Sequence, residues 1–100
     1  MTLEISENNG VLTGTVTGRL DTAAAAQFAK EMEPLLAGAD KKIVLDCTRL
    51  EFISSSGLRL FLSLKKATMA NGGDITLKGV SPSVKQVFSI TGFSSLFSFE

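Results

Sequence analysis

Apolar and polar residues alternate at the start of the chain, which is the pattern of half-buried β-strands. Leu3 to Ser6 alternates in this way, and Val11 to Thr17 continues as a second stretch rich in Val and Thr. The turn signal Asn8-Asn9-Gly10 separates the two stretches. The pattern therefore predicts a β-hairpin whose second strand is broken by Gly18 to Asp21.

The next segment, from Ala23 to Leu36, has the spacing of a helix with one buried face. Asp21 or Thr22 can cap this helix, because a short oxygen side chain accepts hydrogen bonds from the free N–H groups of the first turn. Pro34 lies inside the segment, so we expect the helix to kink or to end early. The expected inner face carries Phe28, Met32, Leu35 and Leu36.

A strand and a second helix follow. Ile43-Val44-Leu45 is a short β-rich run, typical of a strand covered on both faces, and we expect it to end at about Asp46. Leu58 to Ala70 has the broad apolar face of a helix, which Asn71-Gly72-Gly73 ends. This helix is expected to begin near Gly57, directly after a run of serines.

The last part of the chain predicts one more helix between two strands. Ile75 to Lys78 alternates as a strand, and Ser81-Pro82 begins a helix with serine as the cap and proline in the first helical position. Thr91-Gly92 ends that helix, and the apolar–polar rhythm of Phe93 to Phe99 predicts a short final strand. The order β-β-α-β-α-β-α-β predicts an α/β fold with a partly parallel sheet and an antiparallel edge.

Length and composition are those of one ordinary globular domain, which we place at residues 1–100. The hydrophobic share is 44 % and the charged share is 20 %. The net charge is zero, and the longest basic runs are the pairs Lys41-Lys42 and Lys65-Lys66. Nucleic-acid binders usually carry a basic face, so we expect no nucleic-acid partner.

The chain contains no histidine, which removes the commonest general base and the imidazole metal ligand. Its acidic residues are scattered, and the single cysteine, Cys47, cannot form an internal disulfide or a Cys-rich metal site. We therefore expect no catalytic residues, no metal and no cofactor, and a role other than that of an enzyme.

Neither a signal peptide nor a membrane-spanning segment is visible. Met1 to Glu4 lacks a charged region followed by an apolar stretch, and no run reaches the roughly 20 apolar residues of a membrane span. We expect a cytoplasmic protein that does not insert into membranes.

Ser54-Ser55-Ser56-Gly57 is the most informative stretch, because it lies just before a predicted helix. A serine at this position can simply cap the helix. The same geometry suits a phosphate, since a helix N-terminus carries free N–H groups and a partial positive charge. Phosphorylation would add about −1.5 to −2 charges and would oppose the docking of a partner on that spot. Arg59, one turn beyond Ser55, is either a phosphate contact or a solvated helix charge.

Two catalytic interpretations of this turn are disfavoured. A hydrolase nucleophile elbow needs glycine two residues before the serine, where the chain has Ile53, and no histidine is available to activate Ser55. A nucleotide-binding phosphate loop needs a Gly-Lys-Ser/Thr ending, which the turn lacks. The hypothesis that remains is a serine that is modified rather than catalytic.

Residues Asp46 to Leu58 resemble the signature of anti-sigma factor antagonists, the bacterial STAS domains: an apolar strand ending in Asp, a short stretch, and then Asp-Ser-Ser/Thr-Gly-Leu. Gly18-Arg19-Leu20-Asp21 is similar to the family's Gly-x-Leu-Asp segment before its first helix, and Thr91-Gly92-Phe93 with Phe97 resembles its C-terminal ending. The resemblance spans nearly the whole chain. It implies a STAS-like α/β fold, with a mixed sheet of four to five strands, an antiparallel edge strand and helices packed mainly on one face.

The resemblance also implies a function. Such a domain binds an ATP-dependent anti-sigma factor, which is also a serine kinase, and thereby frees a sigma factor. The kinase phosphorylates the domain, and a metal-dependent serine phosphatase resets it. By alignment Ser55 is the phosphoacceptor, and the implied partner-binding residues are Asp21, Asp46, Ser54, Ser56, Gly57 and Arg59.

Ser54 departs from the family pattern, which has Asp before the acceptor. Three successive serines leave the acceptor open by one position, and the loss of the carboxylate can alter contacts with the kinase. Some STAS modules carry no phosphorylation, so the alternative function is an accessory subunit that binds a membrane transport ATPase irrespective of Ser55. An exposed patch of Phe93, Phe97 and Phe99 would favour that alternative.

Overall fold

The computed structural model describes residues 1–100 and contains one five-stranded sheet in the order β1-β2-β3-β4-β5. β1 runs antiparallel to β2, whereas the other neighbouring strands are parallel. This arrangement confirms the predicted mixed sheet with an antiparallel edge strand. The elements, in chain order, are β1 (Thr2–Asn8), β2 (Val11–Leu20), α1 (Thr22–Glu31), α2 (Glu33–Ala37), β3 (Lys42–Ile53), α3 (Ser55–Asn71), β4 (Asp74–Lys78), α4 (Pro82–Ile90), the 3-10 helix η1 (Ser94–Leu96) and β5 (Ser98–Phe99).

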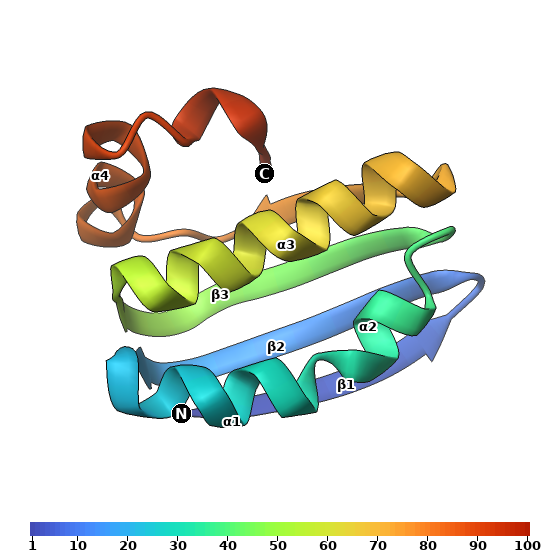
Figure 1. The fold of residues 1–100 in the computed structure, drawn as a ribbon, viewed down its shortest axis with the longest axis horizontal. Coiled ribbons are helices and arrows are strands. Elements are labelled where there is room, and N and C mark those ends of the chain that lie inside the picture. The colour runs from blue at the N-terminus through green and yellow to red at the C-terminus, as the bar shows by residue number, and fades with distance from the viewer.

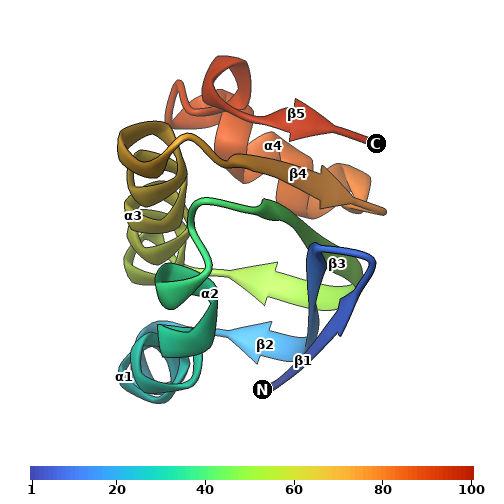
Figure 2. The same ribbon diagram turned by 90° about the vertical axis from the view of Figure 1, so that its right-hand side faces the viewer.

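Helices α1, α2 and α3 lie on one face of the sheet and leave the other face uncovered (Figure 2). α4 lies near the end of the sheet where β3 leads into α3, and it contacts β3 (Figure 1). Residues alternate accordingly along β2, where Leu12 and Val16 are buried towards the helices while Thr13 and Thr15 are half-buried on the open face. Along β3, Ile43 and Leu45 are buried whereas Val44 between them is only half-buried, so the expectation that this strand is covered on both faces is wrong.

A row of phenylalanine rings joins the helical layer to the C-terminal segment. The ring centres of Phe28 and Phe61 lie 5.7 Å apart, and those of Phe61 and Phe88 lie 6.2 Å apart. Phe88 also meets Phe97 and Phe99 edge to face, with ring centres 5.5 and 5.7 Å apart. Phe88 is fully buried at the centre of the row, so its ring attaches α4 to the rest of the core.

The two parallel strands that precede helices are longer than the pattern predicts. β2 continues to Leu20 and β3 to Ile53, and these two residues pair at the shared end of the strands. The register between the strands shifts twice, and each shift is a β-bulge that adds a residue on the β3 side. The predicted strand ends at Thr17 and Asp46 are wrong, because pairing between distant segments outweighs the local break signal at Gly18.

The helix boundaries also differ from the pattern. The predicted helix 23–36 is two helices separated at Met32, because Pro34 has no backbone N–H with which to continue the first one. α3 begins at Ser55, earlier than predicted, because the Ser54 side chain caps it. The predicted final strand is confined to β5 and follows the short helix η1.

We predict that Phe88→Ala destabilises the fold by about 3–5 kcal/mol, because it removes a fully buried ring and leaves a cavity. Ile90→Ala, two residues further along the same helix, should change the free energy of unfolding by less than about 0.5 kcal/mol, because Ile90 is 77 % exposed. Urea unfolding followed by circular dichroism measures both values. Equal effects of the two variants would contradict the central place of Phe88 in the core.

Candidate functional site

The N-termini of α1 and α3 lie side by side at the end of the sheet where the inner strands β2 and β3 end (Figure 1). The last paired residues are Leu20 and Ile53, and each is followed by a helix cap. The Asp21 carboxylate accepts a hydrogen bond from the Ala24 N–H at 2.8 Å and caps α1. The Ser54 N–H donates to the Leu20 carbonyl oxygen at 2.8 Å, which ties the start of α3 to the end of β2.

The three serines of the turn have different surroundings. The Ser54 hydroxyl accepts a hydrogen bond from the Gly57 N–H at 3.1 Å, so this serine is the N-cap of α3. Ser55 is the first residue of the helix and is exposed, whereas Ser54 and Ser56 are half-buried. The structural role of a capping serine therefore belongs to Ser54, and Ser55 presents its side chain to solvent.

Gly57 allows α3 to approach the end of β2 closely. It is buried, and an added Cβ atom would lie 2.7 Å from Leu20 Cγ and 3.1 Å from the Leu20 carbonyl oxygen. Leu20 itself is fully buried. Gly57 therefore lies beneath the surface of the site, where its missing side chain lets the first turn of the helix lie against β2.

The start of α3 is a favourable place for an anion. The first hydrogen bond along the helix runs from the Leu58 N–H to the Ser54 carbonyl oxygen, so the N–H groups of Ser55 and Ser56 have no partner within the helix. These groups and the helix dipole provide partial positive charge. Arg59 is exposed one turn further along, on the same side of the helix as Ser55.

Asp46 lies away from the serine turn and from the ends of β2 and β3. Asp46 pairs with Thr15, whereas the strands end at the pair Leu20 and Ile53. The stretch of β2 from Thr15 to Leu20 is about 16 Å long at the usual rise of a strand, and Asp46 lies about that far from the end of β3. The Asp46 carboxylate accepts hydrogen bonds from the Thr48 hydroxyl at 2.6 Å and from the Thr48 N–H at 3.0 Å. The hydroxyl bond, followed by the backbone bond, lowers the pKa of Asp46 below its ordinary value of 3.8.

Two exposed side chains beside the turn have no signal in the pattern of apolar and polar residues. Arg19 and Phe52 lie opposite each other near the ends of β2 and β3. The guanidinium carbon of Arg19 lies 4.5 Å from the centre of the Phe52 ring, and Phe52 remains 37 % exposed. Their pairing depends on the bulged register between the strands, which no local pattern in the sequence reveals.

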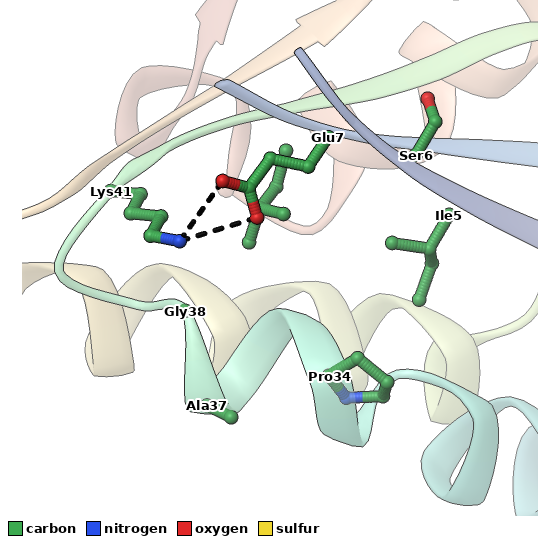
Figure 3. A pocket seen from close by; sticks show the side chains of 8 residues that line it. Ile5, Ser6, Glu7, Pro34, Ala37, Gly38 and Lys41 are labelled. Carbon is green, nitrogen blue, oxygen red and sulfur yellow. Dashed lines mark hydrogen bonds and ion pairs between the residues drawn. The ribbon is translucent and has the colours of Figure 1, made fainter. Parts of the chain in front are cut away.

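A pocket of about 410 Å³ lies between the β1–β2 hairpin and α2 (Figure 3). Ile5 and Pro34 contribute apolar lining, and the Lys41 ammonium forms an ion pair with the Glu7 carboxylate at 3.2 Å. Lys41 precedes β3 whereas the serine turn follows it, so the pocket and the turn lie at opposite ends of that strand. None of the predicted site residues lines this pocket.

Other groups add little to the chemistry of the site. Burial raises the pKa of the Cys47 thiol to about 12, so the thiol stays protonated at neutral pH. No three acidic or cysteine side chains lie close enough together to hold a metal ion. None of the helices combines the length and the apolar composition that crossing a membrane requires.

We predict that Gly57→Ala destabilises the protein by about 1–3 kcal/mol, because the new methyl group would overlap Leu20. Leu20→Ala alone should cost about 2–5 kcal/mol. The double variant should lose less than the sum of the two, since truncating Leu20 makes room for the methyl group. Urea unfolding of the three variants measures this coupling, and strictly additive losses would contradict the contact.

We also predict that Thr48→Val returns the pKa of Asp46 towards 3.8, because it removes the hydroxyl bond that lowers it. The lowered value means that Asp46 contributes stability above its ordinary pKa and loses this contribution as the pH falls through the lowered value. NMR titration of the Asp46 carboxyl measures the shift. An equal pKa of Asp46 in the wild-type chain and in Thr48→Val would show that the hydroxyl bond does not lower this pKa.

Known proteins are similar to this chain in sequence and in fold. The profile of the STAS domain matches residues 2–100. BtrV of Bordetella bronchiseptica, which is named as an anti-sigma factor antagonist, is 34 % identical over 97 residues, covering 97 % of this chain and 84 % of that protein. The anti-sigma-B factor antagonist of Staphylococcus aureus is 27 % identical over 81 residues, covering 81 % and 75 %. A crystal structure from Thermotoga maritima, also named as an anti-sigma factor antagonist, superposes with a TM-score of 0.86 at 22 % identity, covering 97 % and 84 %. The chain therefore belongs to the STAS domain family.

Proposed function

We propose that this chain is a bacterial anti-sigma factor antagonist that is switched by phosphorylation of Ser55. In its unphosphorylated form it binds an anti-sigma factor that is also a serine kinase, and so frees a sigma factor. Phosphorylation releases it from the kinase, and a metal-dependent serine phosphatase resets it. Because sigma factors act on RNA polymerase, this role places the chain in the cytoplasm.

The names of the relatives support the first part of the proposal. The Bordetella and Staphylococcus proteins are both named as antagonists of anti-sigma factors, and both matches cover most of this chain. Proteins with that name are regulatory binding proteins, which supports a binding role for this chain rather than catalysis.

The exposure of Ser55 is the observation that carries the phosphorylation switch. Ser54 is engaged as the N-cap and Ser56 is half-buried, so Ser55 is the serine that a kinase reaches without disturbing the cap. In the transfer, Ser55 Oγ forms a bond to the γ-phosphorus of ATP, the hydroxyl proton passes to a base of the kinase, and ADP leaves.

A phosphate on Ser55 would change the surface much more than the fold. The dianion meets the free N–H groups at the start of α3, while the Ser54 cap and its bond to Leu20 stay intact. Its charge and hydration oppose the docking of a partner on the same spot. Asp21 and Arg59 flank the turn and complete the proposed contact surface, from which Asp46 is distant.

The alternative function, an accessory subunit of a membrane transport ATPase, is not favoured. Its expected sign is an exposed patch of Phe93, Phe97 and Phe99. Phe97 is only 7 % exposed, and the other two rings are half-buried against the core. These rings stabilise the fold, so they leave no aromatic docking patch that would support the alternative.

We predict that an anti-sigma factor kinase of the source bacterium, given ATP, adds one phosphate to this chain at Ser55. Intact-mass and fragment mass spectrometry measure the gain and its position. Ser55→Ala should bind the kinase without gaining mass. Ser55→Asp should bind it at least about 10-fold more weakly with an unchanged circular dichroism spectrum, because its carboxylate imitates part of the phosphate charge.

Ser54→Ala and Ser56→Ala are the matched controls for this experiment. Both keep Ser55, so both should accept the phosphate. Ser54→Ala should also lower the free energy of unfolding by about 1 kcal/mol, because it removes the cap of α3. A phosphate found on Ser54 or Ser56 of the wild-type chain, or none from any anti-sigma factor kinase of that bacterium, would refute the assignment of Ser55.

A further inference from the structure

The edge of the sheet beside Ser55 carries an aromatic ring and a cation on its uncovered face. Leu20 and Ile53 are buried towards the helices, so the residues that precede them, Arg19 and Phe52, point to the opposite face. Both side chains are exposed, and the guanidinium carbon lies 4.5 Å from the ring centre. Phe52 is separated from the N-cap of α3 by one residue, so the pair lies directly beside the phosphoacceptor turn.

Arginine is concentrated in this part of the molecule. The chain has three arginines, and all of them lie in the last part of β2, the last part of β3 or the first turns of α3, namely Arg19, Arg49 and Arg59. Lysines, in contrast, are spread from α1 to α4. Arg49 lies close enough to Asp46 to help lower the pKa of that carboxyl. Arg19 is the arginine whose guanidinium lies over an aromatic ring, and it forms no ion pair with an acidic side chain of the chain.

We propose that Arg19 and Phe52 form a docking element for an acidic segment of the protein partner. One carboxylate of that segment binds the edge of the Arg19 guanidinium through two parallel hydrogen bonds, and a neighbouring apolar side chain packs on Phe52. Charge complementarity selects this occupant, because a guanidinium that lies over an aromatic ring still offers the pair of N–H donors that a carboxylate matches. This inference rests on the proposed function, since the partner is the anti-sigma factor kinase.

The position of the pair links docking to the proposed switch. A phosphate on Ser55 places up to two negative charges at the turn that follows Phe52 and one helical turn before Arg59. It weakens the attraction between Arg19 and the partner's carboxylate, and it repels that carboxylate directly. An acidic docking segment therefore accounts for release on phosphorylation with no change in the fold of this chain.

The test is the affinity of the unphosphorylated chain for the anti-sigma factor kinase that modifies Ser55, measured by isothermal titration calorimetry. Arg19→Glu should weaken binding by about 30-fold or more, Arg19→Lys by about 3- to 10-fold, and Phe52→Ala by about 10-fold. Lys66→Glu makes the same charge reversal at an exposed position in the C-terminal half of α3, and should change the affinity by less than about 2-fold. Circular dichroism and thermal unfolding show whether each variant is folded.

The salt dependence of binding and the phosphorylation of Ser55 distinguish failure of the docking element from failure of the proposed function. Wild-type affinity should fall as salt rises, and Arg19→Gln should make this dependence shallower. At saturating kinase, Arg19→Glu should still accept phosphate on Ser55. Wild-type binding that Arg19→Glu and Phe52→Ala leave unchanged would overturn the docking element alone. Failure of the wild-type chain to bind or to be phosphorylated would overturn the proposed function, and this inference with it.

Discussion

The contact between the first turn of α3 and the end of β2 determines how the site is built. The Ser54 N–H bonds to the Leu20 carbonyl oxygen, and the buried Gly57 brings the helix backbone against the Leu20 side chain. Both contacts fix the start of the helix relative to the sheet. As a result the side chain of Ser55 faces solvent, while its neighbours on either side are partly covered. Because β2 and β3 are parallel, α1 starts at the same edge and adds a second positive helix end.

Features of the fold that depend on local chemistry could be predicted from the sequence. The turn signal Asn8-Asn9-Gly10 gave the hairpin, and Ser81 caps α4 through a hydrogen bond from the Val84 N–H at 3.3 Å. The ends of β2 and β3 could not be predicted, because they depend on pairing between segments about 30 residues apart in the chain. Gly18 illustrates the difference. Its φ of +92° is unusual for a strand, yet the pairing of β2 with β3 continues through it.

In the candidate site, too, features set by the local sequence could be predicted, whereas those set by contacts between distant segments could not. The position of the serine turn before a predicted helix singled it out, and the resemblance to a known family assigned the acceptor to Ser55. Neither could show which serine caps the helix, since that depends on the hydrogen bond between Ser54 and Gly57. The resemblance to a known family placed Asp46 among the partner-binding residues, but β3 continues well beyond Asp46 to Ile53. The pair formed by Arg19 and Phe52 depends on a bulge, which changes the direction of side chains without a signal in the spacing of apolar residues.

The exposed position of Ser55 at the head of an already capped helix has a consequence for timing. None of the hydrogen bonds described for the turn needs to break when a phosphoryl group is added to or removed from Ser55. The two forms are therefore separated by no refolding barrier within this chain. Under the proposed function, the response time of the circuit is set by the turnover of the modifying enzymes, roughly 1–100 events per second for a kinase, rather than by any slow rearrangement of the domain itself.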